Sequence, residues 1–183
     1  GLDQADWLAD ELNMYVARTE GPWYDEGVSL GNAILSRWPI IRWAVHRLPD
    51  VTGAPSYRRA VVAQLDTPYG RWWTVCTHLD YRFDQSATRM AQCEALSAIV
   101  DSLREDPEVE TPVIVAGDFN MWPSEIPRYV DQLGLVDLVE ATSSDRRPVR
   151  ECADCTRLGR RCGHLWTHKN GNGPNSAVQQ IDF

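Results

Sequence analysis

Lysine is almost absent from this 183-residue chain, and long hydrophobic runs are missing from it. Lys169 is the single lysine among 18 basic residues, which stand against 26 acidic ones and give a formal charge of -8. This charge disfavours a broad surface that binds polyanions by releasing counterions, so any phosphate contact must be local. No aliphatic run is longer than that from Val113 to Ala116, which is far shorter than the roughly 18 to 20 apolar residues of a membrane span, and no transmembrane segment is predicted.

Cysteine is also scarce. The chain has five, an odd number, and three of them fall between Cys152 and Cys162. A secreted scaffold held together by disulfides is therefore disfavoured. The first residues lack the basic segment and apolar core of a signal peptide. These features favour a cytoplasmic location, and the natural start of the protein is expected to lie upstream of Gly1.

The rest of the composition, 43% hydrophobic and 24% charged, is typical of one globular domain with a buried core. Patterns of strand and helix are mixed along the chain. Pro68 and Gly70 predict a tight turn between two strands, and Val113 to Ala116 is typical of a strand covered on both faces. Helices are expected over 3–13, 86–104 and 124–133, and strands over 14–17, 32–36, 40–48, 60–66, 72–79, 113–116, 135–139 and 178–183.

Polar residues follow two of these strands. Asp118 and Asn120 are two positions apart after strand 113–116, where a loop opens. A carboxylate there could take a proton from water or hold a hard cation, and an amide could donate to a phosphoryl oxygen. The alternative is an Asx turn that only ends the strand. His78 lies near the end of strand 72–79 and, taken alone, is better explained as a hydrogen-bonded core histidine.

Taken together, five short segments match one family in their order and spacing. They are Gly31-Asn32-Ala33-Ile34-Leu35-Ser36-Arg37, Thr77-His78-Leu79-Asp80, Arg89-x-x-Gln92, Gly117-Asp118-Phe119-Asn120 and Ile181-Asp182-Phe183. The sequence resembles the endonuclease/exonuclease/phosphatase superfamily over nearly its whole length. The resemblance implies an α/β (α+β) fold like that of deoxyribonuclease I, in which two mixed β-sheets pack as a sandwich with flanking helices and the active site lies at one end.

The resemblance also implies roles for these residues. His78 would hydrogen-bond the scissile phosphate, and Asp118 would orient or deprotonate the attacking water. Asn120 would hold Asp118 and a phosphate oxygen, and Asp182 would orient a catalytic histidine. The cofactor would be Mg2+ or Mn2+, with Asp118 and Asn120 among its ligands. Three further residues would contact the substrate or support the site: Asn32, Arg89 and Gln92. For the two on the helix, capping and core packing are the alternative.

Two parts of the family pattern have no counterpart here. The family's metal-binding Glu and phosphate-binding Asn would precede the segment that matches Gly1, and its closing Ser-Asp-His would follow the strand that stops at Phe183. Residues 1–183 are therefore expected to be the central part of a single domain, incomplete at both termini. Because catalytic groups act as a unit, this part alone is expected to be inactive.

A basic insert over about 142–164 carries six arginines and shows little periodicity. Its pattern offers four soft or borderline ligands for a structural Zn2+: Cys152, Cys155, Cys162 and His164. His168 could replace the histidine of this set. The alternative is an arginine-rich loop with incidental thiols.

Two functions from different classes follow. The first is a metal-dependent hydrolase of phosphate esters, most plausibly a phosphodiesterase or nuclease, with nucleic acid ranked ahead of phospholipid and inositol phosphate. Its partner is the phosphate-ester substrate, and no obligate protein partner is indicated. The alternative is a non-catalytic binding module, stabilised by zinc, on a degenerate phosphohydrolase scaffold.

Overall fold

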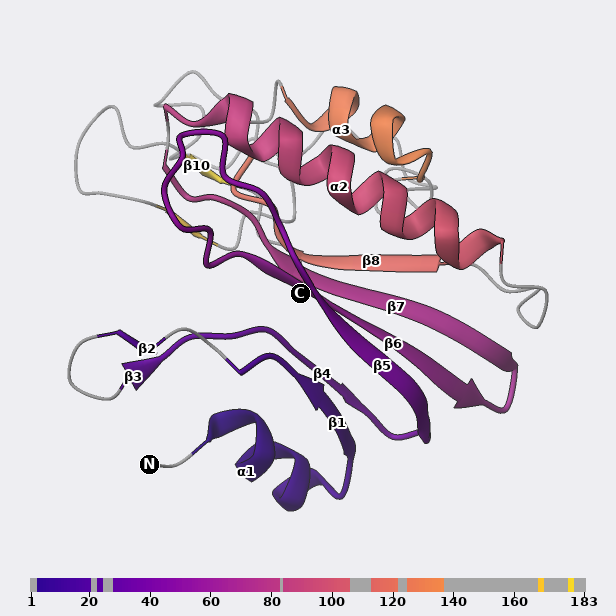
Figure 1. Ribbon diagram of the computed structural model, residues 1–183. Coiled ribbons are helices and arrows are strands. Elements are labelled where there is room, and N and C mark those ends of the chain that lie inside the picture. The colour runs from indigo at the N-terminus through magenta and orange to yellow at the C-terminus, as the bar shows by residue number, and fades with distance from the viewer. Residues whose placement is uncertain are drawn as a thin grey trace, which may run out of the picture.

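A four-stranded mixed sheet lies at the centre of the protein (Figure 1). The computed structural model describes residues 3–20, 23–24, 28–82, 84–105, 113–121, 125–136, 168–169 and 178–179. The strands of this sheet follow the order β5 (Ile40–Arg47), β6 (Arg59–Thr67), β7 (Gly70–His78) and β8 (Val113–Asp118). The first three are antiparallel neighbours, whereas β8 runs parallel to β7. The predicted turn between β6 and β7 is confirmed, with Thr67 opposite Gly70.

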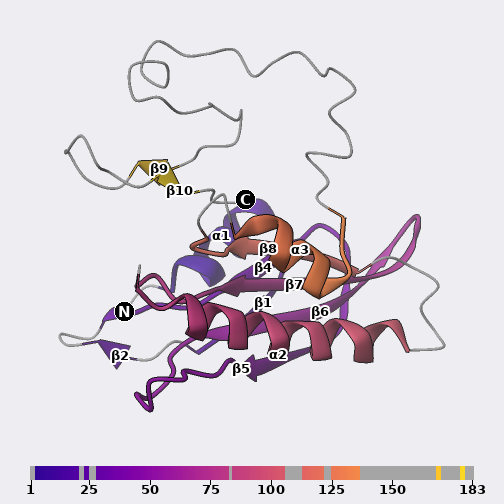
Figure 2. The ribbon, with the colours of Figure 1, turned by 90° about the horizontal axis from the view of Figure 1, so that it is seen from above.

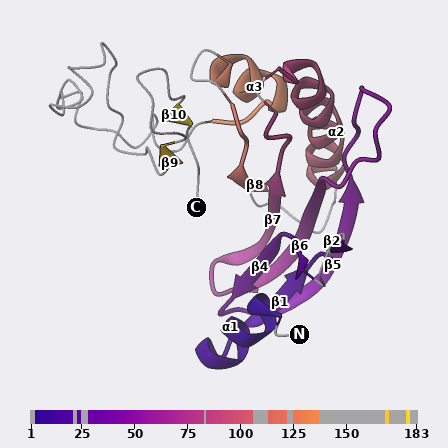
Figure 3. The ribbon, with the colours of Figure 1, turned by 90° about the vertical axis from the view of Figure 1, so that its left-hand side faces the viewer.

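A second, two-stranded sheet packs on one face of the first. It consists of the antiparallel strands β1 (Tyr15–Arg18) and β4 (Ala33–Ser36), with helix α1 (Gln4–Leu12) beside them (Figure 3). Ala17 and Ile34 from this sheet meet Val61, Ala63 and Leu65 of β6 in a buried apolar cluster. The alternating side chains of β6 thus serve two cores, because odd and even positions face opposite sides of a strand.

Helices α2 (Ser86–Arg104) and α3 (Ile126–Leu133) cover the other face of the main sheet, and α2 runs along its strands (Figure 2). Val62 and Val75 of the sheet pack there against Cys93 and Leu96 of α2 and Tyr129 of α3. The predicted sandwich with flanking helices is confirmed. Among the described residues, no helix combines the length and the apolar surface needed to cross a bilayer.

The predicted helices and strands agree with the structure to within one or two residues at most ends. The helix expected over 3–13 is confirmed, and the Asp3 side chain caps it by accepting hydrogen bonds from the backbone N–H groups of Ala5 and Asp6. The strand predicted over 178–183 is present at its start as β10 (Val178–Gln179), and its remainder lies outside the described residues. Its antiparallel partner β9 (His168–Lys169) and the antiparallel pair β2 (Trp23–Tyr24) and β3 (Val28–Ser29) were not predicted.

The strand predicted over 135–139 is wrong at its start, and its remainder lies outside the described residues. Gly134 adopts a left-handed conformation at the end of α3, and the Leu135 N–H donates to the carbonyl of Val130. Leu135 therefore still belongs to the helix cap and cannot pair with a strand.

Candidate active site

Polar residues from five strands meet at one end of the sandwich. Thr19 follows β1, Asn32 precedes β4, Arg59 begins β6, His78 ends β7 and Asp118 ends β8. Because β7 and β8 are parallel, their carboxyl ends reach the same edge of the sheet. β6 is antiparallel to β7, so its amino end lies there too. The order and direction of the strands therefore assemble this site.

His78 and Asp118 are direct neighbours across the β7–β8 pair. The His78 Nε2 atom lies 3.6 Å from Asp118 Oδ2. The two strands remain joined one residue further on, where the Leu79 N–H donates to the carbonyl of Asp118 at 2.8 Å. The two side chains are 42% and 23% exposed, so a ligand from solvent can reach both.

A tight turn directs the Asp118 carboxylate. Its Oδ1 atom accepts a hydrogen bond from the Asn120 N–H at 2.9 Å, which leaves Oδ2 on the side of His78. Asn120 itself is buried with a φ of 51°, and its Nδ2 donates to the Leu79 carbonyl at 3.1 Å. The Asx turn considered as the alternative is thus present, and it orients the same carboxylate that the functional hypothesis invokes.

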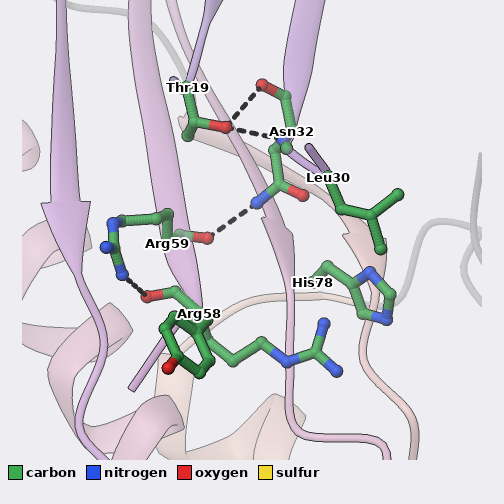
Figure 4. Close-up of a pocket in the computed structure, with 8 residues that line it drawn as sticks. Thr19, Leu30, Asn32, Arg58, Arg59 and His78 are labelled. Atoms are coloured by element: carbon green, nitrogen blue, oxygen red, sulfur yellow. Dashed lines mark hydrogen bonds between the residues drawn. The ribbon is translucent and has the colours of Figure 1, made fainter. Parts of the chain in front are cut away.

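A cavity of about 140 Å³ adjoins His78 (Figure 4). Asn32 lines it, but its Nδ2 donates to the Arg59 carbonyl at 2.7 Å, and its backbone N–H donates to Thr19 Oγ1 at 2.9 Å. Asn32 thus ties the start of β4 to the start of β6. Arg58 also lines the cavity and extends toward His78 in Figure 4.

The surroundings of His78 lower its pKa and favour the neutral imidazole. Burial lowers its pKa below the ordinary value of 6.5, and the positive charge of Arg58 lowers it further. The carboxylates of Asp118 and Asp80 act in the opposite direction without reversing the shift. A neutral imidazole keeps one N–H donor and one acceptor nitrogen, so His78 can hydrogen-bond a phosphate oxygen.

Arg89 and Gln92, both fully buried on α2, hold the backbone that follows β7. The Arg89 Nη1 atom donates to the carbonyls of Arg82 at 2.6 Å and Asp80 at 3.4 Å. Gln92 accepts from the Asp80 N–H at 2.9 Å and donates to the Pro49 carbonyl at 3.0 Å. These two side chains therefore fix the two loops beside His78 rather than contacting the cavity.

An ion network joins the same two loops. The Arg82 Nη2 atom lies 2.6 Å from Asp50 Oδ2 and 2.8 Å from Asp80 Oδ2. Burial would raise the pKa of the Asp80 carboxyl, but the hydrogen bonds and charge of Arg82 outweigh it and lower that pKa. Asp80 is therefore ionised and committed to Arg82.

The predicted metal ligands Asp118 and Asn120 are neighbours in the turn after β8. Among the described residues, no group of three or more His, Cys, Asp or Glu side chains lies close enough to hold a metal ion. Asp118 offers one carboxylate, Asp80 is held by Arg82, and the Asn120 amide donates to a carbonyl. The remaining predicted residues lie outside the described part of the chain: Asp182, Cys152, Cys155, Cys162 and His164.

Several residues near His78 were not singled out from the sequence, among them Tyr57, Arg58 and the Asp50–Arg82–Asp80 network. Arg58 precedes a predicted strand, and Arg82 lies in the loop after another. No periodicity marks either position, and only the pairing of the strands brings their loops together.

Comparisons with known proteins agree with this fold. The model of the Endonuclease/Exonuclease/phosphatase family matches residues 2–177. Over 148 residues the chain is 35% identical to the "Uncharacterized protein YbhP" of Escherichia coli (strain K12), covering 79% of this chain and 54% of that protein. Human Nocturnin, solved with a bound sulfate anion, is similar at a TM-score of 0.58 and 21% identity over 79% of this chain and 52% of that one. D. rerio TDP2, complexed with single strand DNA product, is similar with a TM-score of 0.57 and 17% sequence identity. That match covers 97% of this chain and 63% of the TDP2 chain.

The chain belongs to the Endonuclease/Exonuclease/phosphatase family. The resemblance drawn from its motifs is thereby confirmed. The structural similarities, at 21% and 17% identity, show the shared fold alone. The chain spans about half the length of the curated relatives that it matches.

Proposed function

We propose that the protein containing this chain hydrolyses phosphodiesters. The observation that carries the proposal is the pairing of β7 with β8, which places His78 Nε2 3.6 Å from Asp118 Oδ2 beside a cavity. A neutral donor and an oriented carboxylate at one accessible point suit hydrolysis of a bound phosphate ester. Family membership supports the same class of reaction.

In the proposed mechanism each residue acts on phosphate or water. His78 donates a hydrogen bond to a non-bridging phosphate oxygen and stabilises the charge that grows there in the transition state. The Asp118 Oδ2 atom orients the attacking water and accepts its proton as the new P–O bond forms. The P–O bond to the leaving oxygen breaks, and that oxygen takes a proton from solvent. Asn120 keeps Asp118 in place through its backbone N–H. The loops held by Arg89 and Gln92 keep His78 at the edge of the cavity.

Nucleic acid is the proposed substrate. The whole chain carries a formal charge of -8, which disfavours a broad phosphate-binding surface. Arg58 and Arg59 nevertheless both line the cavity beside His78, and they supply positive charge locally. The D. rerio TDP2 structure contains a single-stranded DNA product and has a similar fold. The arginines suit any phosphate ester, and the similarity to a nucleic-acid complex favours a nucleotide phosphodiester over a phospholipid or an inositol phosphate.

We also propose that hydrolysis requires Mg2+ or Mn2+, which prefer carboxylate and amide oxygens. With the full-length protein, a panel of oligonucleotide, phospholipid and inositol phosphate should show hydrolysis of the oligonucleotide first. Excess EDTA should abolish it, and added Mg2+ should restore it. Undiminished hydrolysis in EDTA would reject the metal requirement, and hydrolysis of the phospholipid alone would reject the substrate.

Substituting Arg58 should change the titration of His78. In the full-length protein, the His78 pKa measured by NMR should lie below 6.5, because burial and the charge of Arg58 both favour the neutral ring. Arg58→Gln removes that charge and should raise the His78 pKa. Arg71→Gln is the matched control, since Arg71 lies near the opposite end of β7 and should leave the pKa unchanged. An unchanged or lower pKa in Arg58→Gln would contradict this electrostatic account.

A further inference from the structure

An arginine cation over an exposed aromatic ring lies beside the candidate active site. The Cζ atom of Arg58 is 5.4 Å from the centre of the Tyr81 ring. Arg58 also lines the cavity next to His78 (Figure 4), and Tyr81 follows His78 by three positions. The Arg58–Tyr81 pair therefore connects the proposed phosphate site with the surface around it.

Two large rings at this edge are exposed to solvent. Tyr81 is 64% exposed and Tyr57, which also lines the cavity, is 53% exposed. Aromatic rings that border a polar, positively charged groove are typical of proteins that bind single-stranded nucleic acid, where successive bases stack on them. The flat faces of the Arg58–Tyr81 pair are thus suited to the base of a nucleotide, and the cavity beside His78 is suited to its phosphate.

The charges near the cavity distinguish among the phosphate esters. Arg59 is engaged with backbone, because its Nη1 donates to the carbonyls of Ser56 and Arg58. Arg58 extends toward His78 (Figure 4). A choline head group is a cation and would be repelled by Arg58, whereas an inositol polyphosphate would call for several such cations. Arginine cations beside exposed flat rings suit a phosphate that carries a base, which a phospholipid head group and an inositol phosphate lack.

We propose that Arg58 and Tyr81 form a platform on which an unpaired nucleobase next to the scissile phosphate stacks, an inference that rests on the proposed function. The base must be unpaired, because a base within a duplex is already stacked and does not offer its face. Single-stranded nucleic acid is therefore the expected substrate. The charge of -8 agrees, since it gives little support for long contacts along a duplex.

The test compares two single-stranded oligonucleotides with the full-length protein. One strand carries its bases, and the other has abasic tetrahydrofuran units beside the cleaved phosphate. The wild-type kcat/KM should be about tenfold higher for the strand with bases, the size expected for the loss of one stacked base. Tyr81→Ala should bring this ratio close to one, mainly through KM. Tyr81→Phe keeps the ring and should preserve the ratio.

Tyr69→Ala is the matched control. Tyr69 is an exposed tyrosine at the β6–β7 turn, at the far end of the sheet, and its loss should change neither rate. The same assay with RNA and with DNA oligonucleotides shows which sugar the site accepts. Equal wild-type rates on the two strands, or an equal loss on both in Tyr81→Ala, would overturn the platform and leave the hydrolase intact. Failure to cleave any oligonucleotide would overturn the proposed nucleic-acid function together with the platform.

Discussion

Asp118→Asn in the full-length protein should lower kcat by roughly 10²- to 10⁴-fold, the contribution typical of general acid–base catalysis, while the fold survives. Asparagine has almost the same volume as aspartate, and its Oδ1 can still accept the hydrogen bond from the Asn120 N–H. The substitution therefore removes the proton acceptor beside His78 and keeps the turn. The measurements are kcat and KM on an oligonucleotide and the thermal midpoint of unfolding.

Asp66→Asn provides the control for Asp118→Asn. Asp66 lies near the end of β6, at the opposite end of the sheet, and its side chain is exposed. The same change of charge there should leave kcat unaltered. Near-normal turnover in Asp118→Asn would reject its assignment as the base, and a large fall in stability would mean that its charge mainly supports the fold.

Gly117→Ala should destabilise the full-length protein by more than about 3 kcal/mol, because an added side chain would both strain the backbone and collide with it. Gly117 has a φ of 141°, which favours glycine. A Cβ atom there would lie 1.9 Å from the Thr77 carbonyl oxygen, which is backbone of the neighbouring strand. The collision falls one residue before Asp118, so β8 would have to move away from β7. Urea unfolding followed by circular dichroism measures the loss.

Gly53→Ala separates backbone strain from the collision. Gly53 also has a positive φ, of 82°, but a Cβ atom there would meet nothing within 4 Å. Its substitution should cost only about 1 to 2 kcal/mol, the usual penalty for an L-residue in a left-handed conformation. Equal losses at the two glycines would show that the close approach of β7 and β8 does not matter to stability.

Local sequence patterns predicted most of the helices and strands. Helix α2 runs from Ser86 to Arg104 as predicted, because apolar and buried polar side chains recur on one face at helical spacing. The turn at Thr67 to Gly70 was readable because proline and glycine restrict the backbone locally. The strand predicted over 135–139 is wrong at its start, because Gly134 ends α3 in a left-handed conformation and the Leu135 N–H donates back to the Val130 carbonyl of the helix.

The candidate site was predictable only in part. His78, Asp118 and Asn120 stood out because they end strands and lie in recognisable motifs. The sequence could not show that Asn120 would turn its amide to the Leu79 carbonyl, or that Arg89 and Gln92 would bind backbone rather than line the cavity. Such partners depend on where separate loops meet, and no local pattern encodes that.

Most helices and strands, the family motifs and the expectation of a local phosphate contact could be inferred without a structure, because each depends on composition or on residues close in the chain. That His78 faces Asp118 could not, since this contact follows from the parallel pairing of β7 with β8, which helix α2 separates in the chain. The position of Arg58 over the Tyr81 ring likewise appears only in the folded protein. These contacts join residues that are far apart in the chain, and the packing of the sheet is the physical cause that brings them together.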